Sequence, residues 1–564
     1  MVVVLVNWLI IFGAALIFGF GVAGLFGKEC RQSVGSLDLL LAAGLVALDV
    51  YAQVFSIFYK VGARACLALL VAGIVAIGFY YWRKSFSLKS MAAFLGKISA
   101  VQWGVAVICV LAAALLTAQS PGVYDTYLYH AQSIRWIEEY GVVPGMGNLH
   151  NRLAYNSAFM PLQALFSLKW LGGQSLHGMN GFLCCMFSVY ALGSSHVVKK
   201  QPLQLCDFFK AAMAVYIWLN REVMSSPSSD ILPMLLVLYI CAKWSEFTEA
   251  GIREAEPYAF LGLLGVWAVT VKLSTMACAL FAVYPFFVLV KEKRWKTVLG
   301  YMFSGAAAVA PWAVRNVIIS GYLLYPYPQL DFFSFDWKMP ESVLTCDSRE
   351  IMVWGRGIKD VSLYDMPFRE WIPIWFSGQS VFYQVLIVLG LAAAAGVVML
   401  LLKGVGQKNK GLHNILLIFV LSGLAVWIFT APLMRYGVVY LLLPVCIVFS
   451  AIFTQGRRGS QFFSWIFFLA FMAGGIWTAW QEFDRDNLVG QEDYEWRETA
   501  VVEWQGIQIA VPVGSDQCGY HAFPGTPYQQ VLELIGLRGE DVGSGFRANE
   551  KYFEKRLNNS GREW

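Results

Sequence analysis

The sequence predicts an all-α polytopic membrane protein with about 13–14 transmembrane helices and a small soluble appendage at its C-terminal end. The chain has 564 residues, of which 58% are hydrophobic and only 14% are charged, whereas soluble domains carry roughly 25% charged residues. Several apolar runs reach the ~18–20 residues that cross ~30 Å of hydrocarbon. Basic residues also alternate between successive loops, as they do in multi-pass proteins.

Fourteen apolar segments are the candidate membrane helices. The first of them, "MVVVLVNWLIIFGAALIFGF", has no basic segment before its apolar run and no small-residue cleavage site, so we expect a retained span and not a signal peptide. The candidate spans are 2–25, 37–58, 61–82, 99–118, 178–196, 204–220, 230–247, 256–271, 273–291, 297–313, 380–402, 413–431, 436–455 and 462–481.

The loops give the expected orientation. Every second loop is short and basic, which predicts a cytoplasmic position for those loops and an N-terminus outside the cytoplasm. The residues that carry this pattern are Lys28, Arg31, Arg83, Lys84, Lys89, Lys97, Lys199, Lys200, Lys291, Lys403, Lys408, Lys410, Arg457 and Arg458. Three larger segments, 119–177, 320–379 and 482–564, are then expected outside.

These outside segments divide the chain into an N-terminal three-helix region (1–98), a main transmembrane region (99–481) and a soluble domain (482–564). In the first outside loop we expect amphipathic helices at about 125–140 and 156–171, joined by the turn-rich "GVVPGMGN". The soluble domain contains the strand-like "GIQIAVPV" and is expected to have an α+β fold.

The cysteines bear on the expected compartment. Most of the eleven lie in apolar spans as small hydrophobic residues. Cys346 and Cys518 lie in outside segments, and we expect a disulfide between them in an oxidising compartment. The sequence has no CxxC pair and no His/Cys cluster, so it predicts no structural zinc site. It also lacks the glycine motifs of ATP-driven and nicotinamide-dependent enzymes.

The stretch "YDTYLYHAQSIRWIEEYGVVPGMGNLHNRLAYN" (124–156) is unusually polar for this chain. Helical spacing places Tyr129 and Gln132 on the same face as Asp125. Glu138 and Glu139 are expected to form a solvated helix face. His150 and Arg152 have two readings: they contribute to a site, or they hold a loop together.

Other charged residues stand at span ends on the same predicted side of the membrane: Asp230 in "SSPSSDIL", Lys272 in "TVKLST", Arg315 in "PWAVRNVI" and Arg435 in "APLMRYGV". Ionisable groups at membrane depth cost about 2.5–3.5 kcal/mol and usually face protein or water. With Asp125, these residues would give two carboxylates and three cations, which suits an anionic substrate. The alternatives are a helix cap for Asp230 and snorkelling anchors for the basic residues.

The pattern resembles the GT-C superfamily of glycosyltransferases, polytopic enzymes that take a sugar from a polyprenyl-phosphate donor at the outer membrane face. Asp125 matches the acidic motif that follows an early span, and Asp230 matches the acidic residue that opens a later one. "RN" followed by "G-Y-x-x-Y-P" (315–326) and the late "RY" (435–436) match the two remaining motifs. The resemblance covers roughly 99–455.

More narrowly, the runs "LYH…W…EYG-VPG-GN-H-R" and "DQCGYHAFPGTPY…GFR" are similar to those of a group of bacterial membrane glycosyltransferases. Two features depart from the wider superfamily. Three extra spans precede the acidic motif, which leaves open whether 1–98 belongs to the catalytic region. Thr126 follows Asp125 where many relatives have a second acidic residue, which leaves the metal requirement open.

The resemblance implies transfer of a hexose or pentose from a polyprenyl-phosphate-linked donor to a glycan, lipid or protein acceptor in cell-envelope polysaccharide biosynthesis. It places the protein in the bacterial cytoplasmic (inner) membrane, with its site and C-terminus facing the periplasm. No nucleic-acid partner is expected, and the sequence leaves the oligomeric state open. A divalent metal, Mg²⁺ or Mn²⁺, would be held by Asp125 and Asp230.

Each candidate residue has an expected role. Asp125 is the candidate general base, and Asp230 and His150 are further catalytic candidates. The basic groups expected to bind the donor phosphate are Arg315, Arg435 and Lys272. The residues expected to position the acceptor or the loop are Tyr129, His130, Arg152 and Asn156.

Two other functions fit parts of the pattern. An oligosaccharide polymerase or ligase also relies on outside arginines and a lipid-linked glycan. A lipid or glycan transporter also keeps buried charges, although these usually lie near the bilayer midplane on broken helices. Product length separates a polymerase from a single-sugar transferase.

Overall fold

The computed structural model describes residues 1–25, 36–82, 98–403, 410–453, 459–483 and 485–549. Within these residues, ten helical segments are long and apolar enough to cross a membrane, which confirms the predicted multi-pass, all-α class. They are α1 (Val2–Leu25), α3 (Leu37–Phe58), α4 (Ala63–Trp82), α6 (Ala100–Thr117), α13 (Ile231–Glu249), η4 with α15 (Leu273–Lys291), α16 (Trp295–Ser320), α19 (Val381–Lys403), α20 (Lys410–Thr430) and α21 (Met434–Phe453).

The predicted number of 13–14 spans exceeds these ten because several apolar segments form shorter helices. The helices α11 (Met179–Gly193), α12 (Leu205–Leu219) and α14 (Ala255–Val271) have 15, 15 and 17 residues, fewer than the ~20 residues that a spanning helix needs. Another predicted span corresponds to α22 (Gly459–Gln481).

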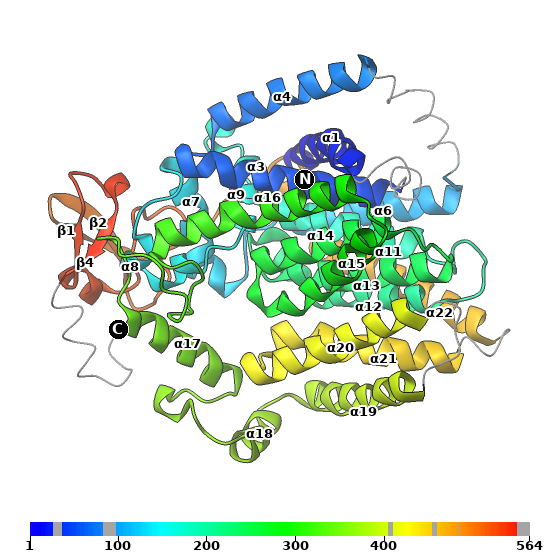
Figure 1. Ribbon diagram of the computed structural model, residues 1–564. Coiled ribbons are helices and arrows are strands. Elements are labelled where there is room, and N and C mark those ends of the chain that lie inside the picture. Colours follow the sequence, from blue (N-terminus) through cyan, green and yellow to red (C-terminus); the bar gives the residue numbers. More distant parts are fainter. Residues whose placement is uncertain (26–35, 83–97, 404–409, 454–458, 484, 550–564) are drawn as a thin grey trace.

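Burial separates the central helices from the peripheral ones. In α13, 94% of the most apolar window is buried, as expected for a helix that is hydrophobic on all sides. In α4 only 17% of the window is buried, and this helix stands away from the rest of the bundle in Figure 1. The candidate site lies at the ends of packed helices such as α13, away from peripheral helices such as α4.

The end of α16 differs from the prediction. The helix continues to Ser320, seven residues beyond the expected end at 313, and stops at Gly321, which has a φ of 84°. Glycine adopts this left-handed conformation at low cost and commonly terminates helices. Arg315 consequently lies inside a membrane helix instead of at its end.

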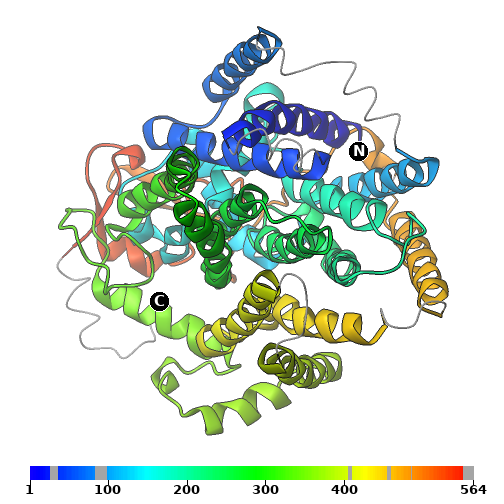
Figure 2. The same ribbon diagram turned by 45° about the vertical axis from the view of Figure 1, so that its right-hand side comes forward.

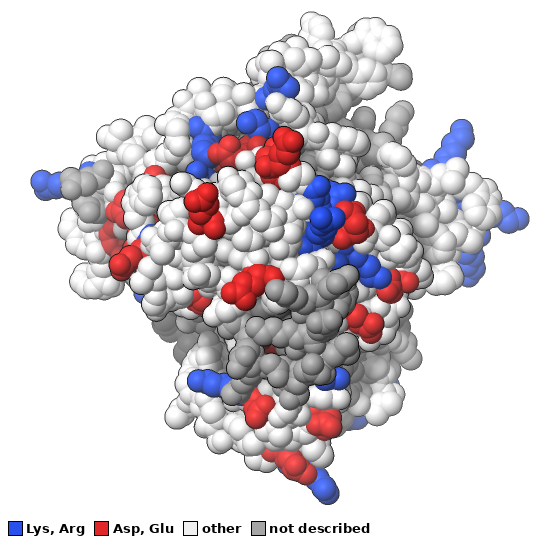
Figure 3. Space-filling model, turned by 90° about the vertical axis from the view of Figure 1, so that its left-hand side faces the viewer, with Lys and Arg blue, Asp and Glu red and all other residues white. Residues whose placement is uncertain are grey.

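Short helices and the appendage gather at one end of the bundle, at the left of Figure 1. Space-filling shows acidic and basic side chains interspersed over this face (Figure 3). Among the described residues, the short helical segments outside the long apolar helices are η1 (a π-helix, Thr126–His130), α7 (Ala131–Glu139), α8 (Met146–Leu149), η2 (Asn151–Tyr155), α9 (Phe159–Phe166), α10 (Lys169–Gly172), η3 (Arg221–Ser225), α17 (Glu341–Gly355), η5 (Val361–Leu363), α18 (Phe368–Ser377), η6 (Asp486–Leu488), η7 (Gln529–Glu533) and η8 (Val542–Ser544).

The second helix expected in the first outside loop is shorter than predicted and is not amphipathic. All eight residues of α9 are buried, because α9 packs against α3 and α7. The first expected helix is present as the π-helix η1 followed by α7.

The C-terminal appendage contains two antiparallel pairs of strands, which confirms strand structure there. In the first pair, β1 (Thr499–Trp504) is joined to β2 (Ile507–Pro512) by Gln505 and Gly506. Both joining residues have positive φ, as a tight two-residue hairpin turn requires. The second pair is β3 (Ile535–Leu537) and β4 (Phe546–Ala548).

Hydrogen bonds join the appendage to segment 119–177. The Gly519 N–H donates to the Tyr127 carbonyl over 2.8 Å, and Arg135 Nη1 donates to the carbonyls of Tyr520 and His521, each over 2.7 Å. Side chains from both regions also share one hydrophobic cluster. The appendage thus packs against this end of the bundle and forms part of its wall.

The predicted disulfide between Cys346 and Cys518 is wrong, because neither cysteine is disulfide-bonded. Cys518 is buried inside the appendage, where it packs against Gly525. Cys346 lies on α17. The two thiols therefore belong to separately packed elements.

Candidate functional site

Four charged residues from distant parts of the chain meet at the ends of their helices. Asp125 immediately precedes η1, Asp230 is the N-cap residue of α13, Lys272 links α14 to η4, and Arg435 is the second residue of α21. Arg435 Nη1 lies 2.8 Å from Asp125 Oδ2 and 3.8 Å from Asp230 Oδ2. Lys272 Nζ donates to Asp230 Oδ1. We call these four residues the charge cluster.

Asp230 is the electrostatic centre of the charge cluster. Burial by itself raises the pKa of its carboxyl. The nearby cations Lys272 and Arg435 outweigh this effect and lower the pKa to about 2. Burial also lowers the pKa of the Lys272 ammonium, and Asp230 more than reverses this, so that the pKa is raised. Both groups are therefore charged at neutral pH. The Asp230 side chain makes no helix-capping hydrogen bond, so the capping alternative does not account for it.

Arg435 is the most open member of the charge cluster. Its side chain is 48% exposed, compared with 12% for Asp125 and 17% for Asp230. The ring of Tyr436 lies under both cations, with its centroid 4.0 Å from Lys272 Nζ and 4.9 Å from the Arg435 guanidinium carbon. A cation over an aromatic face is held in place electrostatically. The guanidinium is therefore held on the side of Tyr436 and accessible to solvent on another side.

The π-helix η1 places Tyr129 and His130 beside this cluster. A π-turn inserts an extra residue into a helix and is frequent at functional sites. His130 is fully buried, and neither ring nitrogen has a hydrogen-bond partner among the described residues. Burial lowers the pKa of this imidazole to about 4, although Asp125 and Asp230 act in the opposite direction. His130 is thus neutral at neutral pH, with a free lone pair and a free N–H.

Gln132 does not face the cluster, contrary to the prediction from helical spacing. It is buried and donates to the carbonyls of Gly519 and Ala522 in the appendage, each over 2.8 Å. The π-turn between Asp125 and Gln132 changes the angular relation that a regular α-helix would give.

Arg315 is not brought into the charge cluster. Its side chain is fully buried, with Nη1 donating to Ser56 Oγ over 2.5 Å and Nε donating to Asn156 Oδ1 over 3.1 Å. The nearby acidic group is Asp49 on α3, which accepts from Trp267 Nε1 over 2.8 Å. Asn156 likewise belongs to this internal network. The extension of α16 explains why Arg315 lies deeper than expected.

His150 and Arg152 form part of a second polar group beside the cluster. Burial lowers the pKa of His150 to about 3, and its Nε2 has no hydrogen-bond partner in the described chain. Arg152 interacts electrostatically with Tyr155 and Tyr129. The rings of Tyr129 and Tyr155 lie 5.8 Å apart, so Tyr129 connects this group to the charge cluster.

Two buried carboxyl groups lie near these residues and were not predicted as buried. Asp347 on α17 accepts from Asn151 Nδ2 over 3.0 Å and from Tyr155 OH over 3.3 Å. Glu138 accepts from Ser175 Oγ over 2.7 Å and from the Tyr520 hydroxyl, so the expectation that it is solvated is wrong. Its spacing of four residues from Ile134 on α7 was the available signal for burial.

The charge cluster does not offer a ready metal site. Asp125 and Asp230 supply oxygen atoms of the kind that Mg²⁺ and Mn²⁺ prefer. Their negative charge is, however, already balanced by Arg435 and Lys272. A divalent cation would have to displace these two cations. We therefore derive no step from a metal at this position.

The fold and the charge cluster define a multi-pass membrane protein with a polar site at the ends of its helices. The chain belongs to the family described as domain of unknown function DUF8201, whose model matches residues 1–442. The match includes the N-terminal helices and the whole charge cluster but not the appendage. No curated protein and no solved structure matches the chain.

Proposed function

We propose that the protein is a membrane glycosyltransferase of the GT-C type, which transfers a sugar from a polyprenyl-phosphate-linked donor to an acceptor of the cell envelope. The observation that carries the proposal is the position of Arg435. Its guanidinium joins Asp125 and Asp230 while half of the side chain remains exposed. A reaction with a lipid-phosphate leaving group requires an accessible cation for the phosphate and a carboxylate for the acceptor. The charge cluster offers both at the helix ends.

The arginine would bind the donor phosphate. A guanidinium binds two phosphate oxygens at once, and the ammonium of Lys272 adds a second positive charge beside it. When the bond between the anomeric carbon and the phosphate oxygen breaks, negative charge develops on the phosphate. Fixed cations stabilise that charge in the transition state more than in the ground state.

Asp125 would act as the general base. In the structure its carboxylate pairs with Arg435. A phosphate that binds Arg435 competes with this pairing and leaves Asp125 able to accept the proton of an acceptor hydroxyl. The acceptor oxygen then bonds to the anomeric carbon, and polyprenyl phosphate leaves. Asp230, held by Lys272, would keep Arg435 in place during the exchange.

The position at the helix ends suits a lipid-linked donor. The prenyl chain can remain among apolar helices while its phosphate and sugar reach the charged outer end. His130 and Tyr129 would contact the sugar or the acceptor, because the His130 ring lies near both carboxylates and its nitrogens have no hydrogen-bond partner among the described residues. We assign Arg315 and Asn156 to the internal network and not to the phosphate site.

Mass spectrometry of envelope glycolipids and glycans tests this function. Cells of the native host that carry Asp125→Asn are compared with wild-type cells and with a control. The control is Glu503→Gln, which changes an exposed acid on β1. Loss of one defined sugar, with accumulation of its polyprenyl-phosphate donor, is expected for Asp125→Asn alone. A ladder of product lengths in wild-type cells would identify a polymerase, and an unchanged profile at matched protein level would contradict transfer.

A further inference from the structure

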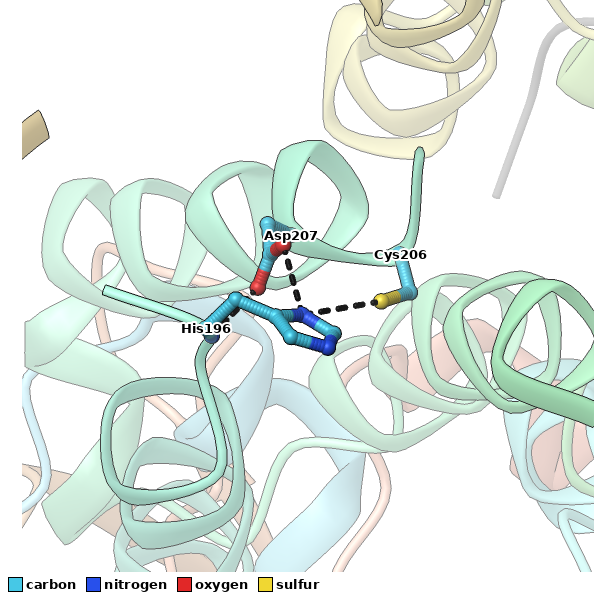
Figure 4. Close-up of side chains that lie close together, drawn as sticks. All are labelled: His196, Cys206 and Asp207. Carbon is cyan, nitrogen blue, oxygen red and sulfur yellow. Dashed lines mark hydrogen bonds and ion pairs between the residues drawn. The ribbon is translucent and has the colours of Figure 1, made fainter. Parts of the chain in front are cut away.

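A second group of chemically reactive side chains lies in the connection between α11 and α12. His196, Cys206 and Asp207 point toward one another (Figure 4), and their ligand atoms all lie within 4.8 Å of one another. His196 Nδ1 is 2.8 Å from Asp207 Oδ2 and 3.9 Å from Cys206 Sγ. The sequence did not predict this group because it has no CxxC spacing and because nine residues separate His196 from Cys206.

This group is remote from the charge cluster. Leu205, beside Cys206, donates its N–H to Glu249 Oε1 over 2.8 Å. Glu249 is the last residue of α13, and Asp230 precedes the first residue of the same helix. At 1.5 Å per residue, the two ends of α13 are roughly 28 Å apart. The group therefore belongs to the opposite end of the bundle and has no part in the proposed transfer.

The two donor distances from His196 Nδ1 are close to those of a tetrahedral metal site. With Zn–N near 2.0 Å, Zn–O near 2.1 Å and Zn–S near 2.3 Å, tetrahedral ligands are separated by about 3.3 Å for N and O and about 3.5 Å for N and S. The distances of 2.8 and 3.9 Å differ from these values by about half an ångström. Binding a metal would therefore require these two distances to change by about half an ångström.

Two carboxyl groups lie beside the Cys206 thiol. Asp207 follows Cys206 in the chain, and Glu249 accepts a hydrogen bond from the thiol. The ammonium of Lys210 also acts electrostatically on this group. A metal ion would replace that thiol proton, and the carboxylate beside it provides a route for the proton to leave. His196 retains 15% side-chain exposure, so the group is reachable from water.

Hydrogen bonding explains only part of this arrangement. Asp207 accepts from the backbone N–H groups of His196 and Gln204, each over 2.9 Å, which accounts for its place at the start of α12. These bonds give no reason for a buried thiol to lie against the same imidazole nitrogen. The combination of imidazole, thiol and carboxylate is the donor set that zinc selects.

We propose that His196, Cys206 and Asp207 bind one divalent transition-metal ion of the zinc class. The ion would join the segment that follows α11 to the start of α12, with a Glu249 oxygen available as the fourth ligand. Its role would be structural, since it would fix a connection that is otherwise held by a few hydrogen bonds.

Metal analysis of the full-length protein in detergent tests the site. The protein is loaded with Zn²⁺, passed through buffer exchange and measured by elemental mass spectrometry. We expect one zinc per chain. Replacement by Co²⁺ should give the near-ultraviolet absorption of a thiolate–cobalt bond. Cys206→Ser should remove that absorption and weaken zinc binding by at least about 100-fold, because even residues behind the ligands change affinity by 10- to 100-fold.

The control is Cys109→Ser, which changes a half-buried thiol on α6 outside the group, and it should keep both zinc and the cobalt spectrum. His196→Gln provides a second variant in case Cys206→Ser fails to fold. Absence of bound zinc in folded wild-type protein overturns the proposal, as does an unchanged cobalt spectrum in Cys206→Ser.

Discussion

Asp125 and Arg435 are 310 residues apart in the sequence, and their side chains form an ion pair of 2.8 Å. The same guanidinium nitrogen lies 3.8 Å from Asp230. Neither distance follows from local structure, because Asp125 follows α6 and Arg435 begins α21. The contact therefore depends on the whole arrangement of helices, and it couples the candidate base to the candidate phosphate ligand.

Substitution of Arg435 tests this coupling. Arg435→Gln should lower the rate of sugar transfer by about 100-fold or more, because removal of one donor to a developing anion typically costs 10²–10³-fold. Arg435→Lys keeps the charge but has one nitrogen in place of a planar fork, so it should recover only part of the rate. Transfer is measured in membranes with matched protein levels.

The matched control is Arg369→Gln, since the Arg369 side chain is 86% exposed and lies at the start of α18. Its transfer rate should equal that of the wild type. Full activity in Arg435→Gln would remove Arg435 from the proposed phosphate site.

The pair of Lys272 and Asp230 allows a double-mutant test. Lys272→Met leaves Asp230 with less compensation for its burial and should lower the free energy of unfolding by about 3 kcal/mol, a typical cost of breaking a buried ion pair. Adding Asp230→Asn should restore most of this stability but not sugar transfer. Thermal unfolding in detergent and transfer assays measure the two effects separately. Equal destabilisation in the single and double variants would contradict a stabilising pair.

The sequence predicted the class of fold and most of the charge cluster, because hydrophobic length and loop charge report directly on membrane helices and their sidedness. It placed Asp125, Asp230, Lys272 and Arg435 on one side, and the structure brings these four into contact. It failed for Arg315, since the end of an apolar helix is poorly marked until a residue such as Gly321 stops it.

Two other predictions failed because they depend on the tertiary fold. No local residue pattern predicts the π-turn of η1. The spacing of a regular α-helix therefore placed Gln132 on the wrong face. Glu138 was assigned to solvent because a charged residue is rarely buried. Its partners, Ser175 and Tyr520, come from segments 37 and 382 residues away. Contacts over such separations require the tertiary fold.

Arg315 should now behave as a structural residue. Arg315→Gln removes a buried cation that faces Asp49 and bonds Ser56 and Asn156. We expect a loss of about 3 kcal/mol in stability, because the buried oxygens of Ser56 and Asn156 lose their hydrogen-bond donor. The folded fraction should keep the wild-type affinity for a polyprenyl-phosphate-linked sugar. Normal thermal stability combined with abolished transfer would instead return Arg315 to the phosphate site.

Asp347 gives a prediction about pH. Burial, aided by Glu350, raises the pKa of this carboxyl to about 6 from its ordinary value of 3.8. Between about pH 4 and pH 6 the unfolded chain loses this proton while the folded chain retains it, so this group makes stability fall as pH rises. The full penalty, about 3 kcal/mol for two pKa units, is present above pH 6.

Asp347→Asn removes the titration and retains a polar group that can accept from Tyr155. The stability of this variant relative to wild type should therefore increase between pH 4 and pH 7, by about 2 to 3 kcal/mol. Thermal unfolding at several pH values measures the difference in stability between the variant and the wild type. The titration of groups that the two proteins share cancels in this difference. Asp365→Asn, which changes an exposed carboxyl outside the helices, should show no such increase. A constant difference for Asp347→Asn across this range would mean that Asp347 is ionised in the folded protein at pH 4, and that Arg152, not burial, governs its charge.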